Sequence, residues 1–310
     1  MTKCIVSGYI GFDNFGDEAI QLVLTNQLKK NGADKITLIS SNPQKTAELY
    51  DVNSCSMLGF FKDLWEADFL YSGGGSLLQD VTSLKSLIYY LGVIYTALFF
   101  KKNVIIYAQG IGPINSKIGQ ILTQFALKRA IGITVRDEKS QELLKSWGID
   151  SKLVKDPVFE LELPVKNKKG TVGVQLRSFP TLTETFLNSL ADEIIKHFSD
   201  KTIRILSLQD SIDLEVCEKF ASILRDKNPN LSIEVLKELS VNDVFEQISE
   251  LEYLIGMRFH ANVAAIKSGV KALAINYDVK VKKLAEEYNL PVIELDQKDF
   301  SQEFEKLLIF

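Results

Sequence analysis

LIGMRFHANVAAIKSGVKALAINYDVK, residues 254–280, is the stretch that decides the fold of this chain. An apolar run ends at Gly256, small apolar residues with good helix propensity span Ala261–Ile266, and a second apolar run covers Lys271–Tyr277. A strand, a helix and a strand in this order are typical of a parallel βαβ unit. The sequence therefore predicts an α/β fold built on parallel sheets.

Charged side chains follow both strands of this unit. Arg258 and His260 come after the first strand and Lys280 after the second, so all three are expected at one sheet edge, where ligands of parallel sheets bind. A lone Arg here is usually a surface charge and a lone His is usually structural. The Arg-x-His pair at a strand-to-helix junction, with its free backbone N–H groups, instead favours an anion site with a proton-transfer group. The other histidine, His197, is predicted to be a partly exposed helix residue.

The strand–helix alternation covers nearly the whole chain and is interrupted once. It spans residues 1–160, breaks in a Pro-, Lys- and Glu-rich segment between Val158 and Gly170, and restarts over residues 170–295. We expect two Rossmann-like domains facing a cleft, which is a glycosyltransferase-B-like plan. A last helix is expected within residues 296–310, and in this plan such a helix often crosses back to the first domain.

Composition excludes several classes of function. The chain is 46% hydrophobic and 25% charged, with a formal net charge of −4, so it reads as a soluble protein without the basic excess of a nucleic-acid binder. Cys4, Cys55 and Cys217 lack metal-site spacing, so we expect no metal, no disulfide and a reducing, cytoplasmic compartment. The N-terminus has no signal-peptide pattern, because the run Cys4–Ile10 resembles a first strand.

Ser86–Phe100 is the most apolar segment of the sequence. It lacks charge but is shorter than the ~20 residues that a spanning helix needs. A buried helix is the first interpretation. The alternative is a helix whose aromatic face rests on the inner face of a membrane, with Lys101 and Lys102 beside it.

Three glycine-rich turns follow strands of the first domain. Gly8, Gly11 and Gly16 do not match the dinucleotide fingerprint, and Gly73–Ser76 and Gln109–Pro113 form the other two turns. Such turns indicate backbone pressed against a ligand or another loop, and together they suit a neutral polyhydroxylated acceptor. The residues predicted to bind that acceptor are Gly11, Asn14, Asp17, Gly74, Gly75 and Gln79. Asp17 is a candidate to bind or deprotonate a sugar hydroxyl, although carboxylates at a helix start also serve as caps.

The motifs GYIGFDNFGDEAI, SGGGSLLQD, YAQGIGP, VRDEKS, DPVF, GMRFH and YDVKV, in this order, resemble those of the polysaccharide pyruvyl transferase family. The similarity is strongest to the CsaB-type members that act on bacterial cell-wall polymers, and it spans about Gly8 to Val281. It implies phosphoenolpyruvate as a co-substrate, with no cofactor, and a lipid-linked glycan containing N-acetylmannosamine as the acceptor. It also implies an acceptor side in residues 1–160 and a donor side in residues 170–295.

The resemblance implies roles for particular residues. Arg258 and His260 fall on the family's Arg-x-His and are the catalytic candidates together with Asp17. Arg136 of the V-R-D motif and Lys280 of the Y-D-x-K-V segment would bind the donor with Arg258, and Arg177 is added as a further cation. The segment LSLQDSIDLE, residues 206–215, departs from many relatives.

The function expected from this is transfer of the enolpyruvyl group to a sugar, giving a pyruvate ketal and phosphate. Phosphoenolpyruvate carries close to three negative charges, so its burial requires cations. His260 would handle one of the proton transfers. Two alternatives stay open: a nucleotide-sugar-dependent glycosyltransferase of the same fold, and a glycan-binding or scaffold protein that has lost activity.

Overall fold

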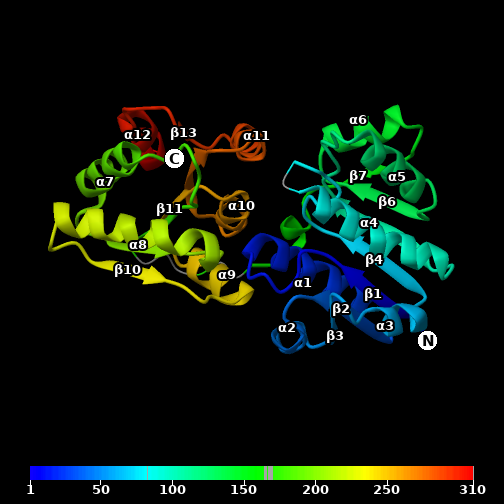
Figure 1. Cartoon of the computed structure of the whole chain (residues 1–310). Helices are drawn as coiled ribbons and strands as arrows, with labels where there is room; N and C mark the ends of the chain where they lie inside the picture. The colour runs from blue at the N-terminus through cyan, green and yellow to red at the C-terminus, as the bar shows by residue number, and fades with distance from the viewer. Residues whose placement is uncertain (82, 164–165, 167–169, 310) are drawn as a thin grey trace. The chain divides into compact units, whose positions relative to one another are not determined.

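The structure is a computed structural model that describes residues 1–81, 83–163, 166 and 170–309. The chain divides into two compact units, Met1–Leu161 and Glu162–Phe310. Each unit is a parallel sheet covered by helices on both faces (Figure 1), which confirms the predicted α/β fold of two Rossmann-like domains. The predicted linker begins inside the first unit, because Pro157 and Val158 are buried in a short 3₁₀ helix; residues 164–165 and 167–169 of that linker lie outside the described residues.

The described N-terminal unit holds a seven-stranded parallel sheet with the order β3-β2-β1-β4-β5-β6-β7. Its strands are β1 (Lys3–Ser7), β2 (Lys35–Ser40), β3 (Asn53–Ser56), β4 (Phe69–Gly73), β5 (Asn103–Gln109), β6 (Gly132–Val135) and β7 (Lys152–Leu153). Its helices are α1 (Phe15–Lys30), α2 (Pro43–Tyr50), α3 (Phe61–Glu66), α4 (Leu84–Phe99), α5 (Lys117–Leu127), α6 (Glu138–Ser146) and the 3₁₀ helix η1 (Pro157–Glu160).

The C-terminal unit holds a six-stranded parallel sheet, within the described residues, with the order β10-β9-β8-β11-β12-β13. Its strands are β8 (Thr171–Gln175), β9 (Thr202–Leu206), β10 (Ile233–Leu236), β11 (Tyr253–Gly256), β12 (Lys271–Asn276) and β13 (Val292–Glu294). Its helices are α7 (Glu184–Phe198), α8 (Asp210–Lys227), α9 (Val241–Ser249), α10 (Phe259–Lys267), α11 (Val279–Glu287) and α12 (Ser301–Ile309).

Local sequence accounts for where several helices begin. Asn14, Thr183 and Ser240 each accept a hydrogen bond at the N-terminus of a helix, and Ser240 forms a capping box with Asp243. Helix α6 is capped in the same way, because the Asp137 carboxylate accepts a bond from the backbone N–H of Ser140 at 2.9 Å. These caps satisfy N–H groups that the first turn of a helix leaves without partners.

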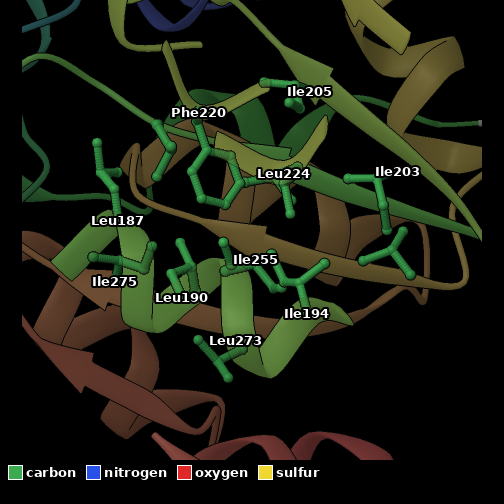
Figure 2. Close-up of a cluster of buried hydrophobic side chains, with 14 of the residues drawn as sticks. Leu187, Leu190, Ile194, Ile203, Ile205, Phe220, Leu224, Ile255, Leu273 and Ile275 are labelled. Atoms are coloured by element: carbon green, nitrogen blue, oxygen red, sulfur yellow. The ribbon is translucent and has the colours of Figure 1, made fainter. Parts of the chain in front are cut away.

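The core of the C-terminal unit lies between its sheet and the helices α7, α8 and α12. Figure 2 shows side chains of α7 and α8 packed against those of β9, β11 and β12. The labelled members are Leu187, Leu190, Ile194, Ile203, Ile205, Phe220, Leu224, Ile255, Leu273 and Ile275. The C-terminal helix α12 contributes Phe304 and Leu307 to this core and packs with α7.

Ser86–Phe100 corresponds to α4, a helix with one buried face. Its side chains at Leu87, Tyr90, Leu91 and Ile94 lie in the core of the N-terminal unit, as the first interpretation of this segment expected. Within the described residues, no helix has both the length and the apolarity needed to cross a membrane.

Candidate functional site

The C-terminal unit reverses its strand order between β8 and β11, which lie side by side at the centre of the sheet. Crossovers leave these two strands in opposite directions, and the gap between their carboxyl ends is where open α/β sheets bind ligands. Gln175 ends β8 opposite Gly256, which ends β11. Arg177 and Arg258 each come two residues after one of these strand ends, so two of the four predicted donor cations belong to this switch point.

Arg258 is held by a buried ion pair that the sequence analysis did not predict. Its Nε and Nη2 atoms each donate to the Asp213 carboxylate at 2.7 Å, and Nη2 also donates to Gln209 Oε1 at 3.1 Å. The Asp213 side chain is 0% exposed and that of Arg258 is 9% exposed. Burial raises the pKa of Asp213, and the bidentate bond to Arg258 opposes that rise. Nη1 is the guanidinium nitrogen that these bonds do not use.

The main chain on either side of Arg258 is also fixed by buried amides. The Gln175 side chain accepts a bond from the Arg258 backbone N–H at 2.6 Å. Asn262 Nδ2 donates to the backbone oxygens of Gly256 at 2.9 Å and Arg258 at 3.1 Å. Two buried atoms next to this turn, Asn262 Oδ1 and Arg177 Nε, have no hydrogen-bond partner in the described structure. Buried polar atoms of this kind are rare in proteins and are expected to meet a ligand or water.

Arg177 lies against Tyr277 at the end of β12. Its Nη1 atom is 3.4 Å from the tyrosine hydroxyl, and its guanidinium carbon is 5.6 Å from the centre of the tyrosine ring. The backbone N–H of Arg177 contacts the sulfur of Met257, the residue before Arg258, at 3.3 Å. Arg177 and Arg258 therefore lie near each other, and both lower the pKa of Asp213 against the dominant effect of burial.

His260 and Lys280 occupy equivalent places in two neighbouring helices. His260 is the second residue of α10 and Lys280 is the second residue of α11, and the two helices pack together. Both side chains are half-buried, and the His260 ring meets the edge of the Phe259 ring at 5.0 Å between centroids. The structure thus brings Arg177, Arg258, His260 and Lys280 to the carboxyl edge of one sheet.

The N-terminal unit has its own switch point between β1 and β4, and the triple-glycine turn follows β4. Gly74 and Gly75 have φ angles of +76° and +68°. A Cβ atom on Gly75 would lie 2.5 Å from Asp17 Oδ1, and one on Gly74 would lie 2.6 Å from the Ile20 side chain. Close contact with α1 therefore explains both glycines, and it places the predicted acceptor residue Asp17 beside the turn.

The other predicted acceptor residues bond to nearby backbone. Asn14 accepts from the Gly16 N–H at 3.1 Å, and Gln79 accepts from the Val81 N–H at 2.7 Å. Gly11, at φ +80°, donates its N–H to the buried Glu18 carboxylate at 2.7 Å. These bonds give Gly11, Asn14 and Gln79 structural roles, and their part in acceptor binding stays a prediction.

Arg136 belongs to the N-terminal unit, whereas the other predicted donor residues belong to the C-terminal unit. It follows β6 and donates to the buried carboxylate of Asp156 at 2.7 Å and to the Ser76 hydroxyl at 3.4 Å. A Cβ atom on Gly110 would lie 2.6 Å from the same Ser76 hydroxyl. The glycine-rich turns after β4 and β5 therefore meet at Arg136, and each unit contains one buried Arg–Asp pair at the carboxyl edge of its sheet.

Sequence reasoning missed Asp213, Gln209, Gln175 and Asp156 as members of these clusters. For Asp213 a signal was present, because it occupies the buried face of α8 at helical spacing with Val216, Cys217, Phe220, Ala221 and Leu224. An acid on an apolar helix face predicts a buried cation as partner. For the other two residues the sequence signal was weaker: Gln175 stands at a strand end, and Asp156 precedes Pro157.

Comparison with solved structures places this fold in the glycosyltransferase-B-like class. The UDP-GlcNAc 2-epimerase of Neisseria meningitidis has a TM-score of 0.65 at 11% identity, covering 100% of this chain and 92% of that one. The enzyme of the same name from Methanocaldococcus jannaschii has a TM-score of 0.62 at 13% identity, with coverages of 100% and 92%. Anabaena HepE, solved with UDP, has a TM-score of 0.59 at 12% identity, with coverages of 100% and 88%. At these identities the likeness shows the fold alone.

The sequence itself identifies the family. The chain belongs to the polysaccharide pyruvyl transferase family, whose sequence model matches residues 14–279. Among curated proteins, none matches the chain significantly. The protein is therefore an enzyme of the class that transfers pyruvyl groups to polysaccharides, which confirms the family resemblance.

Proposed function

We propose that this enzyme takes its pyruvyl group from phosphoenolpyruvate and forms a ketal with two hydroxyls of a sugar, releasing phosphate. The observation that carries the proposal is the set of Arg177, Arg258, His260 and Lys280 at the switch point of β8 and β11. Three fixed cations can offset the charge of a buried donor with a carboxylate and a phosphate. The half-buried imidazole adds a group that can donate and accept a proton.

Arg258 suits the donor because its guanidinium is held rigidly. The two bonds to Asp213 fix the plane of the side chain, and Nη1 then points a preset N–H pair at an anion. The first turn of α10 adds backbone N–H groups, because Arg258 occupies its N-cap position and contributes no side-chain cap. Arg177, with its unpaired buried Nε, supplies a second guanidinium group that can bind a carboxylate or phosphate in a bidentate way.

The reaction needs one proton added to carbon and two removed from oxygen. His260 donates a proton to the methylene carbon of phosphoenolpyruvate, and the first sugar hydroxyl adds to the adjacent carbon as it loses its own proton. The C–O bond to phosphate then breaks, and the second hydroxyl adds to the same carbon and loses its proton, which closes the ketal. Of the two protons that the hydroxyls release, one returns to His260 and the other leaves with the phosphate. A positioned acid–base group is worth about 10²–10⁴-fold in rate.

The acceptor is proposed to be N-acetylmannosamine in a lipid-linked precursor of a cell-wall polysaccharide, as the CsaB-type resemblance implies. Asp17 beside Gly75 is proposed to bind one of its hydroxyls, with Gly11, Asn14, Gly74 and Gln79 nearby in the same unit. Arg136 keeps the donor-binding role that the resemblance implies, and its ion pair with Asp156 fixes the direction of its side chain.

A second candidate is glycosyl transfer from a nucleotide sugar. It is favoured by one observation, namely that structurally similar proteins were solved with UDP or UDP-glucose bound. Direct titration of the purified protein with phosphoenolpyruvate and, separately, with UDP distinguishes the two candidates. Our proposal expects that the protein binds phosphoenolpyruvate and that Arg258→Lys binds it at least tenfold more weakly, because lysine lacks the bidentate guanidinium group. Binding of UDP without binding of phosphoenolpyruvate would favour the second candidate.

A further inference from the structure

The helices α4 and α5 turn large apolar side chains outward. On α5, Ile118 is 70% exposed, Ile121 is 65% exposed and Phe125 is 48% exposed, and their spacing places them with Leu122 on one helix face. The opposite face of α5, which is buried, carries the smaller Gly119, Thr123 and Ala126 besides Leu127. The helix therefore presents its bulkier apolar residues to solvent, the reverse of an ordinary surface helix.

The outward face of α4 continues this apolar area. Phe99 is 80% exposed and Ile88 is 56% exposed on α4, which lies beside α5 in the N-terminal unit (Figure 1). Tyr95 joins the two helices, since its hydroxyl donates to the Leu122 backbone oxygen at 2.8 Å and its ring stacks on Phe125. We call this area the α4–α5 surface; its exposed apolar members are Ile88, Phe99, Ile118, Ile121, Leu122 and Phe125.

The charge of the α4–α5 surface has one sign. The sequence contains no Asp or Glu from Val81 to Val135, although the whole chain is acidic with a net charge of −4. The exposed cations in this segment are Lys85, Lys101, Lys117, Lys128 and Arg129. Of the acids in adjoining segments, Asp80 accepts bonds from the backbone of Asn115 and Ser116, and Glu66 pairs with Lys3 and Lys35.

We infer that the α4–α5 surface docks the enzyme on an anionic lipid bilayer. Apolar and aromatic side chains that enter the headgroup region, ringed by cations that meet anionic headgroups, are the combination that interfacial helices use. A second copy of the chain fits less well, because a two-fold contact through this surface would bring its cations against each other. The inference does not depend on the donor or the acceptor sugar.

The experiment is sedimentation of the purified full-length chain with vesicles that contain no glycan. Vesicles of phosphatidylcholine alone are compared with vesicles in which a third of the lipid is phosphatidylglycerol. Ile118→Asp tests the apolar part of the surface, and Ile309→Asp, at a residue 84% exposed on α12, is its matched control. Lys117→Glu with Lys128→Glu tests the charge, with Lys298→Glu and Lys306→Glu as the control pair at exposed positions.

We expect binding to the anionic vesicles that falls as salt rises, because surface charges are screened. Each lysine near such a surface contributes about fivefold to the partition coefficient, so the charge-reversing pair should lower it by more than about tenfold. Ile118→Asp should lower it by a similar factor, since an isoleucine buried in the interface is lost. No binding to anionic vesicles, or equal losses in the control variants, would overturn the inference, as would a dimer in solution that Ile118→Asp dissociates.

Discussion

Removing the negative charge of Asp213 is the sharpest test of how the switch point is built. In Asp213→Asn, the guanidinium of Arg258 keeps its buried position and loses the charge that balances it. The pair is almost fully excluded from water, with side-chain exposures of 9% for Arg258 and 0% for Asp213. Breaking a buried pair at one partner typically costs about 3–5 kcal/mol, and we expect the lower end, because Asn still accepts one bond from Arg258.

The size of this effect distinguishes the buried pair from the exposed pairs on the same unit. Lys219 and Glu184 also form an ion pair, but their side chains are 49% and 68% exposed. Solvent screens exposed pairs, so Glu184→Gln should change the stability far less than Asp213→Asn does. Asp226→Asn, at an exposed position on the same helix as Asp213, is the control for the substitution itself.

Unfolding in urea provides the assay, because the two units have different probes. Both tryptophans, Trp65 and Trp147, belong to the N-terminal unit, so their fluorescence follows that unit, whereas circular dichroism follows both. Asp213→Asn should lower the urea midpoint for unfolding of the C-terminal unit. That change should appear in circular dichroism but not in tryptophan fluorescence. A loss below about 1 kcal/mol would refute the reasoning, since it would mean that water reaches Arg258 and replaces the lost partner.

Three further outcomes follow from the described side chains. His260→Ala should lower turnover about 10²–10⁴-fold with little change in melting temperature. The control variant His197→Ala should leave turnover intact. A large change in melting temperature without loss of turnover in His260→Ala would mean that His260 is structural. Burial raises the pKa of Glu18, so folding favours its protonated form and the stability of the N-terminal unit should fall as pH rises through that pKa. Glu18→Gln should remove this slope in urea titrations followed by tryptophan fluorescence between about pH 4 and pH 7, and an unchanged slope would assign it to another group. Gly75→Ala should destabilise the N-terminal unit by more than about 1 kcal/mol, because φ is positive and Asp17 Oδ1 lies 2.5 Å from the added carbon; a neutral result would mean that the turn can shift.

The fold could be read from the sequence because each strand of the central sheet is a short apolar run with a turn signal after it. GITV, residues 132–135, is one such run and forms β6. The edge strands β3 and β7 were not predicted, since NSCS lacks apolar alternation and Lys152–Leu153 has only two residues. Local pattern therefore reports the buried strands and fails at the two edges of the N-terminal sheet, where little hydrophobic burial constrains the sequence.

The candidate site was predictable only where residues follow a strand closely. Arg258 and His260 stand just after an apolar run, so their place at the sheet edge followed from the parallel topology. The partner of Arg258 comes from α8, in a different crossover, and a contact between segments so far apart in sequence leaves no local periodicity to detect. The glycines of the turn after β4 did give a clear sequence signal, but that signal had two possible causes. A run of glycines is equally consistent with a bound ligand and with the close contact to α1 that the structure contains.

The measurement that tests the account most directly is the release of inorganic phosphate from phosphoenolpyruvate with an acceptor capped by N-acetylmannosamine. A reaction without acceptor is the control, and mass spectrometry of the acceptor identifies the product. The account predicts phosphate release that depends on the acceptor, a mass gain of one pyruvate ketal, and a loss of both in His260→Ala. Failure of the protein to bind or turn over phosphoenolpyruvate would contradict the assignment of the β8–β11 switch point as the donor site.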